Sequence, residues 1–200
     1  MLTNLPMDVS VLFEPTIDLK RLTEVLDGLG HEGRVHAIRS WTPRRQAELF
    51  EVAKNHQPLE LDFLVPASVR PLAPVIHDGH NSLPAFARFQ KRFTRLEGEA
   101  SPMGGYNHQT LEWLTGPGYF VVSKGEGEHD GELVIDYTRL PMHKPPSWPA
   151  IRSNDGGLAS LVYGGMLDYV RGISAHVSIG RAYKGKAMDA WFTLVRRDVA

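Results

Sequence analysis

The chain has 200 residues, of which 42% are hydrophobic and 22% are charged, and its formal net charge is −1. This length and composition are typical of one globular domain, and the near-neutral charge argues against a strongly basic nucleic-acid-binding protein. The chain has no cysteine, which excludes disulfides, thiolate metal sites and a cysteine nucleophile.

The N-terminal segment 1–15 lacks the basic start and the long apolar run of a signal peptide. No run in the chain approaches the roughly 20 apolar residues that a membrane-spanning helix needs. We therefore expect a cytoplasmic protein whose partner is a small-molecule ligand rather than a nucleic acid or a membrane. Association into a homo-oligomer stays open.

Two helix signals come first in the chain. Apolar residues recur at helical spacing in the segment 16–29, which predicts a helix that ends at Gly30. Thr42 followed by Pro43 is an N-cap signal and predicts a second helix that runs to about Asn55.

The letters from Gly28 to Gly33 match the G-x-G-x-x-G pattern of dinucleotide-binding sites. That pattern needs a strand before it and a helix after it. Here it follows a predicted helix, and the segment 34–40 reads as a strand or a linker. We interpret these glycines as a helix end and a turn, so the pattern identifies no cofactor.

The segment 59–65 alternates apolar and polar residues, which predicts a half-buried strand closed by Pro66. Farther along, Ser82 is a candidate N-cap for another helix. Its buried stripe would consist of Phe86, Phe89 and Phe93. Its cations, Arg88, Lys91, Arg92 and Arg95, would then face outward.

The second half of the chain is rich in strand signals. Alternating segments predict strands near 119–123, 132–140, 174–183 and 188–197. Apolar spacing between Leu158 and Ile173 predicts a helix, on which Asp168 and Arg171 would form a surface ion pair.

The expected fold class is therefore α+β, with N-terminal helices followed by a twisted antiparallel sheet in β-β-α-β-β order and helices covering one face. Residues 1–200 would form a single domain, in which a mainly helical half, 1–100, packs on the sheet half, 117–200.

Two histidines three residues apart, His77 and His80, precede the helix expected at Ser82. Neutral imidazole is a common ligand for transition metals. A catalytic metal would need a third ligand, for which His108 and Glu112 are the candidates. This arrangement predicts a metal-dependent lyase, hydrolase or oxygenase.

The same segment also supports an anion site. The N-terminus of a helix attracts anions and keeps a nearby histidine neutral. His80, Asn81 and Ser82 would then hold a carboxylate or phosphate, and a neutral histidine there would act as a general base. A capped polar turn without any function explains these residues as well.

Two further segments carry polar side chains that suit a binding site. Tyr106 and His108 follow a glycine pair, which lets a backbone approach a ligand closely. His176 shares one strand face with Ser178, Gly180 and Ala182, and this face is either exposed to solvent or lines a cavity.

The function that these patterns favour is small-molecule binding, with a pocket for an anionic or polar-aromatic ligand near the 77–82 turn. His77, His80 and His108 are the candidate catalytic or metal-binding residues. Asn81, Ser82, Tyr106 and His176 are the candidate ligand-binding residues. Catalysis stays open, and the other alternative is a non-catalytic interaction domain that uses the proline-rich segment 141–149 and the last hairpin.

Overall fold

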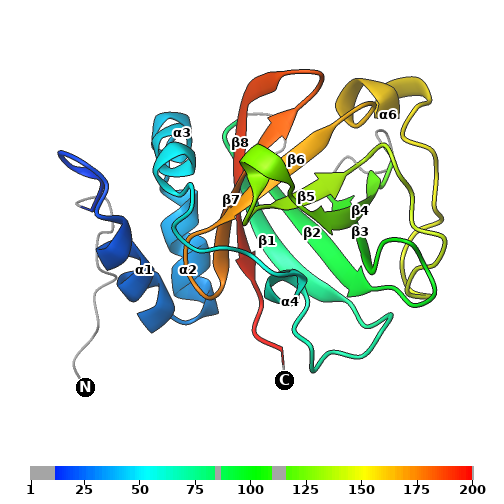
Figure 1. Ribbon diagram of the computed structural model, residues 1–200, viewed down its shortest axis with the longest axis horizontal. Helices are drawn as coiled ribbons and strands as arrows, with labels where there is room; N and C mark the ends of the chain where they lie inside the picture. The colour runs from blue at the N-terminus through cyan, green and yellow to red at the C-terminus, as the bar shows by residue number, and fades with distance from the viewer. Residues whose placement is uncertain (1–11, 84–86, 110–115, 200) are drawn as a thin grey trace.

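The computed structural model describes residues 12–83, 87–109 and 116–199. In these ranges the chain forms a closed barrel of eight antiparallel strands (Figure 1). Each strand pairs with the next one along the chain, and the last strand pairs with the first, so that the sheet has no open edge. The strands are β1 (Val75–Asn81), β2 (Arg88–Arg95), β3 (Met103–His108), β4 (Tyr119–Lys124), β5 (Leu133–Asp136), β6 (Leu167–Gly172), β7 (Val177–Tyr183) and β8 (Ala187–Arg196).

The helices are short and lie outside the barrel wall. They are α1 (Leu19–Gly28), α2 (His31–Arg39), α3 (Pro43–Val52), α4 (Leu61–Leu64), the 3-10 helix η2 (Gly127–His129) and α6 (Gly157–Val162). Helices α1 to α3 gather on one side of the barrel, where α2 and α3 contact β8 and α1 lies farther out (Figure 1). Their buried side chains share a core with Val177, Ile179 and Val195, which point out of the barrel wall.

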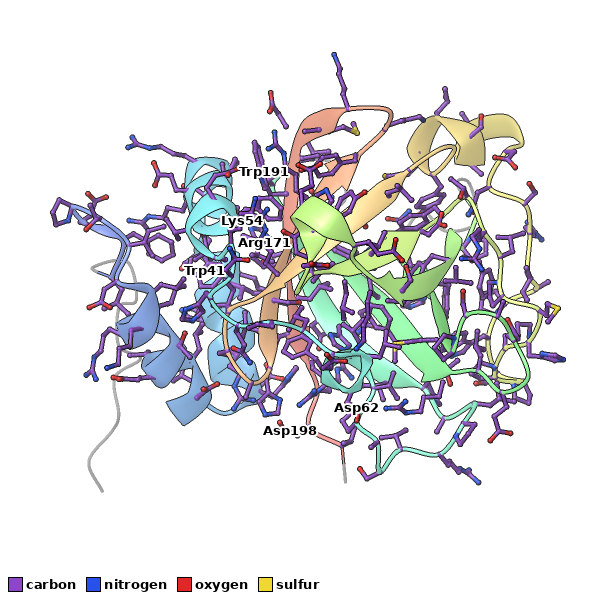
Figure 2. The ribbon with its side chains drawn as sticks, in the orientation of Figure 1. Trp41, Lys54, Asp62, Arg171, Trp191 and Asp198 are labelled. Atoms are coloured by element: carbon purple, nitrogen blue, oxygen red, sulfur yellow. The ribbon has the colours of Figure 1, made fainter. Side chains whose placement is uncertain are left out.

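A buried arginine ties this helical layer to the barrel. Arg171 donates from Nε to Oε1 of Glu132 at 2.8 Å and from Nη1 to the carbonyl oxygen of Phe50 at 2.6 Å. Figure 2 shows Arg171 between the helices and the barrel, and its guanidinium lies 3.8 Å from the centre of the Phe50 ring. The two contacts with Phe50 anchor α3 to β6, and the ion pair with Glu132 ties β6 to the residue that precedes β5.

Side chains alternate between the outside and the inside of the barrel, as strand geometry requires. Residues opposite each other on neighbouring strands share a face, so the register pairs His77 with Lys91 and Lys91 with Asn107 on the inner face. Large rings fit inside because small residues face them. A Cβ atom on Gly180 would lie 2.2 Å from Cζ of Phe192, so only glycine leaves room for that ring.

One end of the barrel is closed by the segment around α4. Leu59, Leu64 and Val65 belong to the same buried core as the inner residues Val75 and Phe93. Nε2 of His77 also donates to the carbonyl oxygen of Leu64 at 2.9 Å. The interior is therefore filled at this end, and any space for a ligand must lie toward the other end.

Several of the predicted elements are confirmed. The helix predicted in 16–29 is α1, and the helix predicted after Thr42 is α3, whose N-cap hydroxyl accepts from the backbone N–H of Arg45 at 3.3 Å. The four strands expected in the second half are β4, β5, β7 and β8, and they are antiparallel.

The predicted fold class is wrong. The sheet is not an open α+β layer covered by helices on one face, because β1 pairs with β8 and closes the barrel. The prediction failed because β1, β2 and β3 were not recognised as strands and β6 was assigned to a helix. Without them, the second half of the chain has too few strands to close a barrel.

Four local predictions are also wrong. The segment 88–95 is strand β2, not a helix, and Ser82 extends the pairing of β1 with β8 through two hydrogen bonds with Trp191. The segment 59–65 contains the short helix α4 instead of a strand, and 34–40 belongs largely to α2. The helix predicted from Leu158 to Ile173 divides into α6 and strand β6.

In the described ranges no helix is long and apolar enough to cross a membrane.

Candidate functional site

A cavity of about 300 Å³ opens at the end of the barrel away from α4. Its size is at the lower limit of the range that is usual for small-molecule sites. The walls are mainly apolar, with Phe89 and Phe192 from the strands and Val162, Tyr163 and Met166 from α6 and the chain that follows it. An eight-stranded barrel of this kind has room inside for packed side chains or for one small ligand.

Four polar side chains form a buried cluster on the cavity wall. Lys91 of β2 donates from Nζ to Oδ1 of Asn107 at 3.1 Å and to Oδ2 of Asp168 at 3.0 Å. It also contacts the hydroxyl of Tyr137. That hydroxyl accepts from Nδ2 of Asn107 at 2.9 Å and donates to Oδ2 of Asp168 at 3.3 Å. We call these four residues the lysine cluster.

The charges of the lysine cluster are almost completely removed from water. The side chains of Lys91 and Asp168 are each 3% exposed. The ammonium of Lys91 is also surrounded by aromatic rings, whose centres lie 4.8 Å away for Phe192 and 5.3 Å away for Phe120. Three hydrogen bonds and the ring faces compensate for the loss of solvation, which would otherwise make a buried ammonium very unfavourable.

Burial moves the proton affinities of the two charged groups toward each other. It lowers the pKa of Lys91, and the neighbouring Asp168 carboxylate opposes this shift. It raises the pKa of Asp168, again against the effect of its partner. Burial and the charge of Asp168 raise the pKa of Tyr137, so its hydroxyl stays protonated. A proton can therefore pass from Nζ to Oδ2 more easily than between the same groups in water.

The carboxylate of Asp168 has one oxygen that is available to a ligand. Among the described residues only Oδ2 of Asp168 takes part in hydrogen bonds, and Oδ1 has no partner. Because Asp168 lines the cavity, Oδ1 can accept a hydrogen bond from a molecule bound there. Nζ of Lys91, in contrast, already uses all three of its protons.

The entrance of the cavity is apolar. Leu83, Leu161 and Met188 line it and are 43%, 73% and 36% exposed. Lys184, on the turn between β7 and β8, donates to the carbonyl oxygens of Ser160 and Leu161 and so holds α6 beside the opening. An apolar molecule would therefore meet favourable surface before it reaches the interior.

The predicted metal site at His77, His80 and His108 is wrong. Residues three apart on a strand point to opposite faces, and His77 is fully buried inside the barrel while His80 lies on the outer face and contacts the carbonyl oxygen of Ala87. His108 lies on the outer face opposite Gln90. No group of three His, Asp or Glu residues in the described ranges could hold a metal. Glu112 lies outside these ranges.

The other candidate ligand-binding residues are dispersed. Asn81 lines the cavity, and its Oδ1 accepts from the backbone N–H of Leu83. Ser82 bonds to β8, Tyr106 packs against Trp148 outside the barrel with ring centres 4.9 Å apart, and His176 lies 3.4 Å from Asp198. His176 was expected to share a strand face with Ser178, Gly180 and Ala182. That face points into the barrel, but β7 begins at Val177 and His176 lies before it.

The lysine cluster was not found from the sequence. Lys91 was assigned to the wet face of a helix and Asp168 to a surface pair with Arg171. One signal was present, because Phe89, Lys91 and Phe93 also alternate with Arg88, Gln90 and Arg92. Read with a period of two, this segment has a polar face and an aromatic face that contains one lysine.

Comparisons with protein-family models, with curated proteins and with solved structures found no match. The function has to be inferred from the geometry of the cavity.

Proposed function

We propose that the protein binds a small, largely apolar molecule with one neutral polar group inside the barrel. The observation that carries this proposal is a cavity with apolar walls and a single buried ion pair, Lys91 and Asp168. Burial of the apolar part of the ligand against Phe89 and Phe192 supplies the main driving force. The polar group then forms a hydrogen bond with Oδ1 of Asp168.

The lysine cluster favours a neutral ligand over an anionic one. The charges of Lys91 and Asp168 cancel, and the ammonium has no unused donor. A carboxylate entering the cavity would bring a buried charge that no free cation among the described lining residues neutralises, and it would lie close to Asp168. A hydroxyl group can donate to Asp168 without this penalty. From the sequence we expected an anionic or polar-aromatic ligand near residues 77–82. We now propose a neutral ligand that binds inside the barrel.

Isothermal titration calorimetry with two ligands of equal chain length tests the proposal. Nonan-1-ol is expected to bind, and nonanoate is expected to bind at least about tenfold more weakly, a difference of about 1.4 kcal/mol. Equal affinity for the two ligands, or tighter binding of nonanoate, would contradict the proposed role of the ion pair.

Two variants of one hairpin test whether the cavity is the site. Ala182 is buried, lines the cavity and pairs with Asp168 across the strands, so Ala182→Phe fills the cavity. Ala187 is exposed and does not line it, so Ala187→Phe is the matched control. Binding of nonan-1-ol should be lost only in the Ala182→Phe variant. If that variant folds and keeps wild-type affinity, the cavity is not the binding site.

A further inference from the structure

We propose that Lys91 forms an imine with ligands that carry an aldehyde or ketone group. This inference rests on the proposed function, because the carbonyl compound has to enter the same cavity. It adds a covalent step and a substrate class that simple binding does not require.

Two features distinguish Lys91 from every other lysine of the chain, its burial and its place on a cavity wall, and a neighbouring carboxylate gives its amine a proton acceptor. All of the lysines lie in the described ranges, and the others are exposed or half-buried. Lys91 alone is buried, and its side chain lines a cavity that is large enough for a small organic molecule. Its Nζ lies 3.0 Å from a carboxyl oxygen, Oδ2 of Asp168, that can take up and return a proton.

The nucleophile arises by proton transfer within the pair. Movement of one proton from Nζ to Oδ2 leaves a neutral amine and a neutral carboxylic acid. In a dry site this neutral form is favoured relative to water, because two charges disappear from a region of low dielectric constant. A lysine desolvated in an apolar pocket is a recognised source of amine nucleophiles for carbonyl substrates.

The reaction balances with the groups present. The lone pair of Nζ attacks the carbonyl carbon, a C–N bond forms, and the carboxylic acid of Asp168 gives its proton to the carbonyl oxygen. The nitrogen then returns a proton to Asp168. The carboxylic acid protonates the new hydroxyl group, the C–O bond breaks and water leaves. The products are a protonated imine, the Asp168 carboxylate and one water molecule, and no oxidant or reductant is needed.

The product keeps the electrostatic arrangement of the resting site. The protonated imine retains one N–H and one positive charge, which can remain paired with Oδ2 of Asp168. The hydrogen bonds from Nζ to Asn107 and Tyr137 are lost. Tyr137 still keeps its contacts with Nδ2 of Asn107 and with Asp168. The rings of Phe89 and Phe192 then surround the carbon chain of the ligand.

Reductive trapping tests the proposal. The wild-type protein is incubated with nonanal and sodium cyanoborohydride at pH 7, and the modified residue is identified by intact mass and peptide mapping. A surface lysine with an ordinary pKa has only about one part in 2,500 of free amine at this pH. Each unit by which its pKa is lowered raises that fraction about tenfold, so Lys91 should be modified at least tenfold faster than any other lysine.

Two controls assign the adduct to the cavity. Excess nonan-1-ol should slow modification of Lys91 without affecting surface lysines. The Lys91→Arg variant keeps a cation beside Asp168 but cannot form an imine, so the dominant adduct should disappear. If Lys91→Arg does not fold, peptide mapping and the nonan-1-ol competition on the wild-type protein decide the question.

The outcomes separate this inference from the proposed function. If nonanal and nonan-1-ol bind competitively but Lys91 is not trapped faster than surface lysines, the imine is refuted and the binding function stands. If Lys91 is trapped but nonan-1-ol gives no protection, the reaction does not occur in the cavity and the inference also fails. If neither compound binds, both proposals are overturned.

Discussion

His77 should make the protein sensitive to mild acid. Its ring is fully buried at the closed end of the barrel, where Nε2 donates to the carbonyl oxygen of Leu64. Its Nδ1 has no hydrogen-bond partner among the described residues. Burial lowers the pKa of His77 from 6.5 to about 3, because a proton on Nδ1 would create a buried charge with no acceptor.

The sign of the effect follows from proton binding in the two states. The unfolded chain takes up a proton at this histidine near pH 6.5, whereas the folded protein does so only near pH 3. The folded state therefore loses stability as the pH falls from 6.5 toward 3. Each unit of pH in this window corresponds to about 1.4 kcal/mol, so the loss between pH 7 and pH 4.5 is about 2.5 kcal/mol.

Urea unfolding at pH 7 and pH 4.5 measures this loss. His77→Gln keeps an N–H that can donate to Leu64 and removes the titrating ring, and His36→Gln, at an exposed position of α2, is the matched control. The wild-type protein and the control should lose about 2.5 kcal/mol more than His77→Gln on acidification. Equal losses in the wild-type protein and His77→Gln would refute the argument, since other titrating groups are common to both.

Three further substitutions test the barrel and its helices by urea unfolding. Lys91→Met should lower the free energy of unfolding by about 3–5 kcal/mol, because it leaves Asp168 buried without its partner. Combining it with Asp168→Asn should cost less than the sum of the two single changes. Strict additivity would show that the pair is not coupled. Gly105→Ala should cost about 1–3 kcal/mol, because its Cβ would lie 2.3 Å from a backbone oxygen, whereas Gly28→Ala, with open space around it, should not destabilise the protein. Thr42→Ala should cost about 1 kcal/mol through loss of the N-cap of α3, and an unchanged stability would mean that this cap contributes nothing.

Local signals in the sequence predicted an element correctly where the residues fitted only one kind of secondary structure or carried a clear helix N-cap. Thr42 and Pro43 identified the start of α3, because an N-cap and a proline at the first turn act within a few residues. The aromatic and β-branched residues concentrated in 119–123 and 188–197 identified β4 and β8, because such side chains favour strands.

The same kind of signal failed where two periods fitted equally well. The spacing of Phe86, Phe89 and Phe93 fits a helix, but Phe89 and Phe93 also fit a strand. In β1, the polar residues from His77 to Asn81 resembled a turn, and they form a strand because both neighbours in the closed barrel supply backbone hydrogen bonds. Local preference is weak enough for tertiary pairing to override it.

The sequence by itself determined the start of α3, the antiparallel strands β4, β5, β7 and β8, and the absence of cysteine chemistry. The closure of the barrel and the lysine cluster were decided by the tertiary structure alone. Lys91 and Asp168 are 77 residues apart in the chain, and their side chains meet at 3.0 Å only because the strand pairings close the sheet around one interior. A charged side chain is stable in such an interior only when the fold brings a partner to it, and no local pattern of residues contains that information.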